Sequence, residues 1–116
     1  MNTTNIAELM LEKKASDIKI FDVKSITTIT DYFIMCSASS EPQSKAICDN
    51  IERTLRKKGM KPINIEGKNK FDWVLMDYTH FIVHIFSNDK RGYYNLDRLW
   101  ADAKVTKVTD DKIDEK

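Results

Sequence analysis

Apolar side chains recur at the spacing of an α-helix in two stretches of the N-terminal half. Residues 5–14 place Ile, Leu and Met on one stripe, and Asn5 with a glutamate three positions later is typical of a capping box. A second stripe follows Ser40, which forms another predicted capping box with Gln43, and it ends before Gly59, a residue favoured just beyond helix C-termini. We therefore expect two amphipathic helices in this half of the chain.

Strand patterns account for most of the remaining apolar residues. Five segments alternate every second position or are continuously apolar: 17–23, 32–38, 62–67, 73–78 and 80–87. The run 32–38 has few polar interruptions, which suits a strand covered on both faces. Only Thr79 separates the last two segments, which predicts a tight antiparallel hairpin. Because a helix joins two of the strands, a crossover is required, and the pattern predicts an α/β fold with a mixed five-stranded sheet flanked by helices.

The C-terminal pattern predicts one further helix, followed by a segment without a clear helix or strand pattern. Residues 90–103 carry Leu96, Leu99 and Trp100 at helical spacing. After Lys104 the residues are mostly charged and alternate with small apolar ones. We therefore expect a single domain over residues 1–104 and a charged, flexible tail over 105–116.

Composition narrows the classes of function. A formal net charge of +1 argues against a protein that attaches to nucleic acid by bulk charge, and no sequence-specific nucleic-acid binding is expected. Binding to a protein that itself lies on RNA remains open. No apolar run approaches the roughly 20 residues of a membrane span, the N-terminus lacks a secretory pattern, and the two cysteines suggest no disulfide framework. We expect a cytoplasmic protein.

No segment has the pattern of a catalytic, metal or cofactor site. The three isolated glycines form no phosphate-binding loop. Metal-dependent nucleotidyl transfer typically uses two acidic residues separated by one position on a strand, and no two acidic residues have that spacing. His80 and His84 would share a strand face about 13 Å apart, too far to hold one ion. We expect no enzyme activity, no cofactor and no metal ion, with Cys36 and Cys48 as core residues.

Large amphipathic side chains are concentrated between residues 73 and 100. Strand alternation places Trp73, Leu75 and Asp77 on one face. Trp, Tyr and Arg dominate the energetics of protein interfaces, and this span contains two Trp, three Tyr and two Arg residues. The pattern itself leaves two interpretations open, because the same aromatic residues also suit the core of a domain with few helices.

Four segments together resemble the ribosome-silencing factor family, also called Iojap-like: DYFIMCSASS, EPQSKAICDNI, KKGMKPINIEG and WVLMDYTHFIVHIFSNDKRGYYNLDRLWADA. The most specific parts are EG followed closely by WVLMDY, the VHIF strand and R-x-Y-Y-x-L-x-x-L-W. The resemblance extends from the first helix to Ala103. It implies a mixed-sheet α/β domain shaped like a nucleotidyltransferase without its active site. Segment 37–42 departs from the family, which often has Gly, Thr and a basic residue there.

The resemblance also implies a function. Members bind the large-subunit ribosomal protein L-fourteen on the 50S subunit, sterically block joining of the small subunit and damp translation when nutrients are scarce. A role in large-subunit maturation is the alternative, especially in organelles. The partner-binding residues that we infer are Trp73, Leu75, Asp77, His84, Arg91 and Tyr94. The strand is the expected anchor because Asp77 adds a charge suited to a basic ribosomal protein, whereas Trp100 is expected in the core.

Two further interpretations stay open at this point. A nucleotide-processing enzyme would have to bring an acid pair together from distant strands, such as Asp31 with Asp72. A homodimer would form if the hairpin exposed its apolar face and paired with itself.

Overall fold

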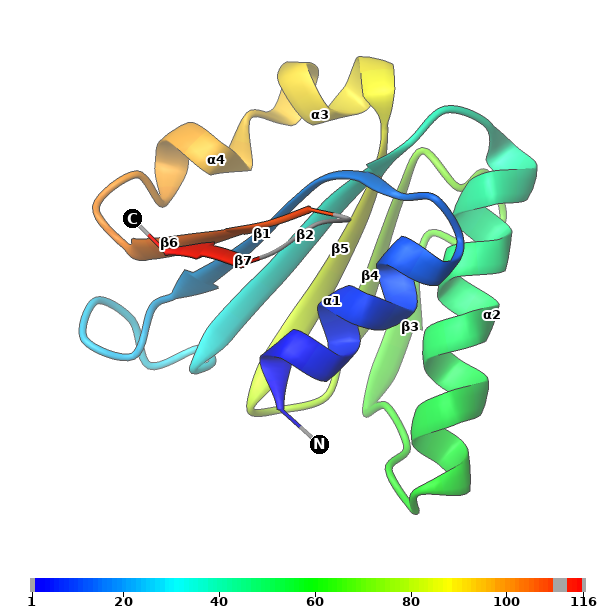
Figure 1. The fold of residues 1–116 in the computed structure, drawn as a ribbon, viewed down its shortest axis with the longest axis horizontal. Helices are drawn as coiled ribbons and strands as arrows, with labels where there is room; N and C mark the ends of the chain where they lie inside the picture. The colour runs from blue at the N-terminus through cyan, green and yellow to red at the C-terminus, as the bar shows by residue number, and fades with distance from the viewer. Residues whose placement is uncertain (1, 110–112, 116) are drawn as a thin grey trace.

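A seven-stranded sheet forms the centre of the computed structural model, which describes residues 2–109 and 113–115 (Figure 1). The helices are α1 (Thr3–Glu12), α2 (Glu41–Lys57), α3 (Asn88–Tyr94) and α4 (Leu96–Leu99). The strands are β1 (Ser16–Asp22), β2 (Tyr32–Ala38), β3 (Asn64–Glu66), β4 (Trp73–Asp77), β5 (Phe81–Ser87), β6 (Lys104–Val108) and β7 (Ile113–Glu115).

The strand order is β3-β4-β5-β2-β1-β6-β7. Strands β2 and β5 pair in parallel, and every other neighbouring pair is antiparallel. The parallel pair exists because α2, β3 and β4 lie between β2 and β5 in the chain and provide the crossover. The predicted mixed α/β fold and the β4–β5 hairpin are confirmed, whereas the predicted count of five strands is wrong.

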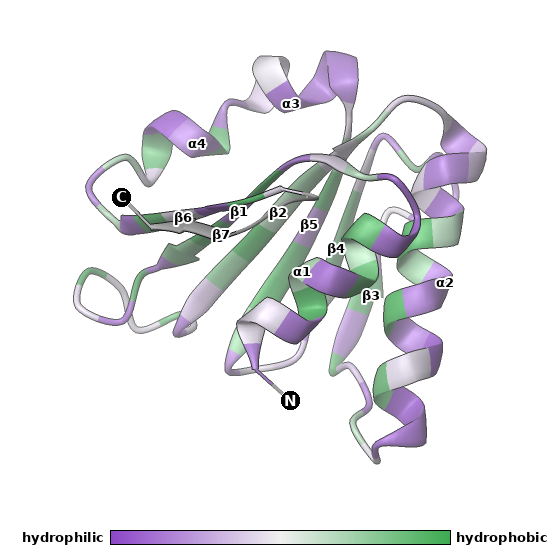
Figure 2. Cartoon of the chain, viewed as in Figure 1, coloured by the Kyte–Doolittle hydropathy of each residue, from purple (hydrophilic) through white to green (hydrophobic). Residues whose placement is uncertain are grey.

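The sheet is covered on both faces, and each face has its own apolar cluster (Figures 1 and 2). Helices α1 and α2 cover the face with the larger cluster, which contains Val74, Met76 and Val83. Helices α3 and α4 lie over the opposite face, where the smaller cluster includes Phe33 and Phe86. Within the described residues, no helix is long and apolar enough to cross a membrane. The two layers explain why both faces of the hairpin carry bulky side chains.

Helix starts show how well short polar motifs predict structure. Helix α1 is capped by Asn2 rather than Asn5, because the two asparagines bond each other reciprocally: Asn5 N–H donates to Asn2 Oδ1 and Asn2 N–H to Asn5 Oδ1. Ser40 caps α2 as predicted. The Gln43 side chain, however, accepts from Ser39 instead of completing a box with Ser40.

The C-terminal prediction needs two corrections. The helix expected over 90–103 is two short helices, because Asn95 adopts the left-handed conformation (φ 49°, ψ 48°) that asparagine tolerates better than most residues. The flexible tail expected after Lys104 begins instead as β6, which pairs with β1 from Ile18–Val108 to Asp22–Lys104. That pairing satisfies backbone groups of β1 that would otherwise form an open edge. Residues 110–112 and 116 of the expected tail lie outside the described residues.

Gly67 fixes the loop between β3 and β4, and its replacement tests that loop. Its φ of +91° suits glycine, and a Cβ there would lie 2.0 Å from the carbonyl oxygen of Trp73. We expect Gly67→Ala to lower the free energy of unfolding by about 2 kcal/mol or more. The matched control is Gly92→Ala in α3, where a Cβ meets no atom within 4 Å beyond its chain neighbours and its own helix backbone, so stability should rise by about 0.5–1 kcal/mol. Urea unfolding measures both, and equal effects would contradict this account.

Candidate docking site on the β4 face

Strand β4 presents Trp73, Leu75 and Asp77 on the sheet face beneath α3 and α4. All three side chains are half-buried, and they alternate with Val74 and Met76, which are fully buried in the larger cluster. Trp73 and Leu75 pack against the smaller cluster. The predicted split of β4 into two faces is therefore confirmed, and its outer half-exposed row forms the centre of the candidate site.

Trp73 is held in place by one polar and several aromatic contacts. Its indole Nε1–H donates to Nδ1 of His84 at 3.0 Å. Its ring stacks on Phe86 with centroids 5.2 Å apart and lies 4.6 Å from the ring of Tyr94. Aromatic pairs at these separations add about 0.5–1.5 kcal/mol each beyond the area that they bury. These contacts together fix the orientation of the indole.

His84 lies behind Trp73 rather than on the surface. Only 4% of the residue is exposed, and burial together with nearby Arg91 lowers the pKa of the imidazole to about 4. The ring is therefore neutral near pH 7, and because Nδ1 accepts from Trp73, the proton lies on Nε2. Nε2 has no hydrogen-bond partner among the described residues. His84 positions the indole and is too buried to be a primary contact.

Arg91 connects α3 and α4 to the sheet. It is 7% exposed, and its Nε and Nη2 donate to the two carboxylate oxygens of Asp97 at 2.7 and 2.9 Å. Nη1 donates to Ser37 Oγ on β2 at 3.0 Å, and Asp17 on β1 lies 3.5 Å away. The hydrogen bond from Arg91 lowers the pKa of Asp97 to about 2. Arg91, inferred as a contact residue, is thus a buried anchor.

Asp17 reaches Arg91 because β1 is irregular at that point. The pairing of β1 with β2 shifts register between Ser16 and Lys19, and Asp17 has a positive φ of 49°. Such a bulge re-aims a side chain locally, here toward the guanidinium. Ser37, the first residue of the segment that departs from the family pattern, contacts the same guanidinium, because its hydroxyl oxygen accepts a hydrogen bond from Arg91.

The exposed part of the site comes from β4 and α3. Tyr94 is 42% exposed and extends the row formed by Trp73 and Leu75. Tyr93 and Leu99 are more exposed still, and helical spacing within one predicted helix gave no indication that Leu99 is exposed. The break at Asn95 changes its direction, and the asparagine was the available signal. We define the β4 face as Trp73, Leu75, Asp77 and Tyr94.

The residues proposed for an alternative enzyme are not brought together. Asp31 precedes β2 next to the start of β5, where His80 lies 3.8 Å away. Asp72 lies at the other end of β5, since its carbonyl oxygen accepts from Ser87 N–H. Seven residues of strand β5 separate the two ends by about 20 Å. His80 is exposed and His84 is buried, so these two also form no shared site.

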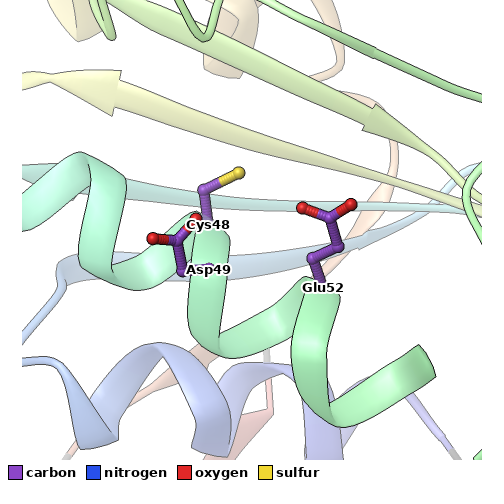
Figure 3. Close-up of side chains that lie close together, drawn as sticks. All are labelled: Cys48, Asp49 and Glu52. Carbon is purple, nitrogen blue, oxygen red and sulfur yellow. The ribbon is translucent and has the colours of Figure 1, made fainter. Parts of the chain in front are cut away.

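One cluster within the described residues has the spacing of metal ligands. Cys48, Asp49 and Glu52 project from α2 with ligand atoms within 4.8 Å of one another (Figure 3). Burial raises the pKa of the Cys48 thiol to about 11, so the thiol keeps its proton at neutral pH. Both carboxylates are already in ion pairs, Asp49 with Lys45 and Glu52 with Arg56 and Lys68. We therefore assign no metal or cofactor to this cluster.

Known proteins match this chain over most of its length. The family model described as "Ribosomal silencing factor during starvation" matches residues 2–116. The chain is 38% identical to the ribosomal silencing factor RsfS of Bacillus subtilis, over 81% of this chain and 80% of that protein. It is 26% identical to the mouse mitochondrial assembly of ribosomal large subunit protein 1, over 83% of this chain and 43% of that protein. A crystal structure from Chromobacterium violaceum aligns with a TM-score of 0.77 and 28% identity, covering 87% of this chain and 88% of that one.

The buried imidazole predicts a loss of stability in mild acid. An unfolded histidine has a pKa near 6.5, whereas His84 in the fold has a pKa of about 4. Between these values the unfolded chain binds the extra proton, so this contribution to stability is complete above about pH 6.5 and falls as the pH decreases. We expect a loss of roughly 3 kcal/mol from pH 7 to pH 4 from this group. Urea unfolding at several pH values measures it.

The control for this pH dependence is the other histidine. His84→Leu should remove most of the slope between pH 4 and 6.5, whereas His80→Gln at an exposed position should retain it. If both variants kept the same slope, His84 would not be its source.

The anchor of α3 and α4 predicts a stability effect at Arg91. Arg91→Met should cost about 3 kcal/mol, because Asp97 keeps its charge in a half-buried site after losing its bidentate partner. The double variant Arg91→Met/Asp97→Leu should recover part of that loss. Arg98→Met, at an exposed position on α4, should change stability by less than about 0.5 kcal/mol. Urea unfolding compares the three, and an Arg91→Met variant as stable as Arg98→Met would refute the anchor.

Proposed function

The chain belongs to the ribosomal silencing factor family, and on that premise we propose that it represses translation by binding the large ribosomal subunit and blocking the small one. The proposed contact is ribosomal protein L-fourteen, and the proposed mechanism is steric and non-enzymatic. It would act in the cytoplasm, chiefly when nutrients are limiting, as the name of the family model suggests.

The half-exposed row on β4 is the observation that carries this proposal. Trp73, Leu75 and Tyr94 offer apolar area, and Asp77 at the end of the row offers a negative charge suited to a basic ribosomal protein. The strand and the buried contacts of Trp73 fix these side chains, so little conformational entropy is lost on binding. A standard interface takes about 800 Å² from each partner, a modest share of the 6701 Å² of accessible surface.

The size of the domain supports occlusion as the mechanism. Its extents are 33 × 32 × 28 Å, so a copy attached through the β4 face would extend about 30 Å from its partner. Two ribosomal subunits meet through closely apposed surfaces, and a body of that thickness between them prevents contact. Such a blocker requires a footprint and a volume but no catalytic group.

Within this proposal, the six residues inferred from the sequence divide into two roles. Trp73, Leu75, Asp77 and Tyr94 would contact the partner. His84 would hold the indole of Trp73 through their hydrogen bond, and Arg91 would hold α3 and hence Tyr94 over the sheet.

A second candidate function is supported by the mouse relative, whose name refers to assembly of the ribosomal large subunit. The same face would then bind a precursor of the subunit rather than the mature particle. Sucrose-gradient profiles of cells lacking the protein distinguish the two, because an assembly role produces immature large subunits and a purely repressive role does not.

Asp77→Arg provides the sharpest test of the docking face. We expect it to weaken co-sedimentation with isolated large subunits at least tenfold and to restore subunit joining, because a positive charge would then face a basic partner. Asp77 Oδ1 also accepts from Thr79 N–H in the hairpin turn, so Asp77→Asn serves as the variant that keeps an acceptor while removing the charge. Asp102→Arg makes the same charge change just before β6, far from β4 in the sheet, and should bind normally.

Trp73→Ala tests the apolar half of the same face. Truncating a central interface tryptophan typically costs 2 kcal/mol or more in binding, equivalent to about thirtyfold. Circular dichroism and urea unfolding establish that each variant is folded. Folded Trp73→Ala and Asp77→Arg variants that bind large subunits like the natural chain would disprove the site.

Light scattering over a dilution series determines whether self-association through this face competes with ribosome binding.

A further inference from the structure

The net charge of the chain conceals a strong segregation of charge. Residues 53–70 contain seven of the 19 basic side chains and one of the 18 acidic ones. This short segment therefore carries +6, and the rest of the chain carries −5, within the total of +1. The seven basic residues are Arg53, Arg56, Lys57, Lys58, Lys61, Lys68 and Lys70, and every one is exposed. We call this set the basic edge.

The fold gathers the basic edge along one side of the molecule. Its members lie on the last turns of α2, in the connection to β3 and in the loop between β3 and β4. Arg56 and Lys68 both pair with Glu52, at 3.0 and 3.4 Å, which brings the β3–β4 loop next to α2. The end of α2 that leads to β3 is mostly hydrophilic, with hydrophobic positions between the polar ones (Figure 2). Strand β3 is an outermost strand of the sheet, so this side faces outward.

Local structural requirements explain only part of the basic edge. Cations near a helix C-terminus are favoured by the helix dipole, which accounts for Arg56, Lys57 and Lys58. The dipole does not reach Lys61 or the β3–β4 loop. Within the described part of the chain, five of the seven have no acidic group within ion-pair distance: Arg53, Lys57, Lys58, Lys61 and Lys70. Their charge is therefore available to a partner.

The basic edge borders the β4 face across strand β3, with its α2 members on the side of the sheet opposite that face. Strand β3 pairs directly with β4, with Asn64 opposite Asp77 and Glu66 opposite Leu75. Ile63 N–H donates to the carbonyl oxygen of Asp77, so the segment after Lys61 lies against the end of β4. At the other end, Lys70 precedes Trp73 by three residues. A large partner seated on β4 would extend over this edge.

From this arrangement we infer that the basic edge binds phosphates of ribosomal RNA next to the protein contact on β4, an inference that rests on the proposed function. Clustered exposed Lys and Arg side chains bind the phosphate backbone without reading its sequence. A membrane surface is disfavoured, because amphipathic helices bind lipid through an exposed apolar face and that of α2 is buried against the sheet. The negative remainder of the chain would orient the molecule with this edge toward RNA.

The test compares two triple variants with equal changes in net charge. Arg53→Glu/Lys61→Glu/Lys70→Glu alters the basic edge in three separate elements and leaves the ion pairs of Glu52 intact. Lys14→Glu/Lys104→Glu/Lys107→Glu alters exposed lysines outside it. The probes are a labelled RNA hairpin duplex, purified large subunits, isolated ribosomal protein L-fourteen, anionic phosphatidylglycerol vesicles and a polyglutamate peptide, each titrated at several salt concentrations.

We expect the edge variant to bind the duplex and large subunits on the order of a hundredfold more weakly at 0.1 M salt, and its salt slope to be shallower by about three. The control variant should bind both like the natural chain, and all three proteins should bind isolated L-fourteen equally. Equal binding of RNA and subunits by the two variants would overturn the inference, as would tighter binding of the natural chain to vesicles or polyglutamate than to the duplex. If the natural chain did not bind isolated L-fourteen, the proposed docking would be refuted instead. The duplex measurements would still decide the role of the basic edge.

Discussion

The buried guanidinium of Arg91 is the constraint on which the proposed docking surface depends. Helices α3 and α4 are short, and a left-handed residue separates them, so neither is stable by its own hydrogen bonds. Arg91 supplies the missing stabilisation, because it donates hydrogen bonds to Asp97 on α4 and to Ser37 in the sheet. Trp100 adds apolar contact, with its ring 4.9 Å from that of Phe33. If the guanidinium were absent, Tyr94 would lose its fixed position beside Trp73.

Trp73 remains ordered although its side chain is only half-buried. Trp73 lies at the boundary between the smaller cluster and solvent, where an aromatic ring alone has several orientations of similar energy. The bond from its indole to His84 selects one of them, and the neutral imidazole permits that bond because a charged ring would have no acceptor. The proposed contact is therefore rigid for electrostatic as well as steric reasons, and an ordered surface binds with a smaller entropic cost.

The alternation of side chains along strands was the most reliable guide from the sequence to the fold, because it depends only on neighbouring residues. It placed Trp73, Leu75 and Asp77 on one face and identified the β4–β5 hairpin. It could not show that His84 and Arg91 are buried, since their burial depends on residues distant in the chain, such as Phe33 beside His84 and Ser37 beside Arg91. The helix pattern failed at Asn95, where backbone conformation, not side-chain polarity, interrupts the helix. Strand β6 was missed because its short, mixed polar and apolar sequence forms a strand only through pairing with β1.

Net charge is limited for the same reason, since a total contains no positions. A value of +1 argues against attachment to RNA only if charges are mixed, and here they are separated by the fold. Separation gives a steric repressor an advantage that a uniformly basic protein lacks. A uniformly basic domain would bind RNA in many orientations, most of which leave the subunit interface open. In the proposed mode of binding, one basic edge beside one aromatic and acidic face would favour a single orientation, and the volume of the domain would then obstruct the approaching subunit.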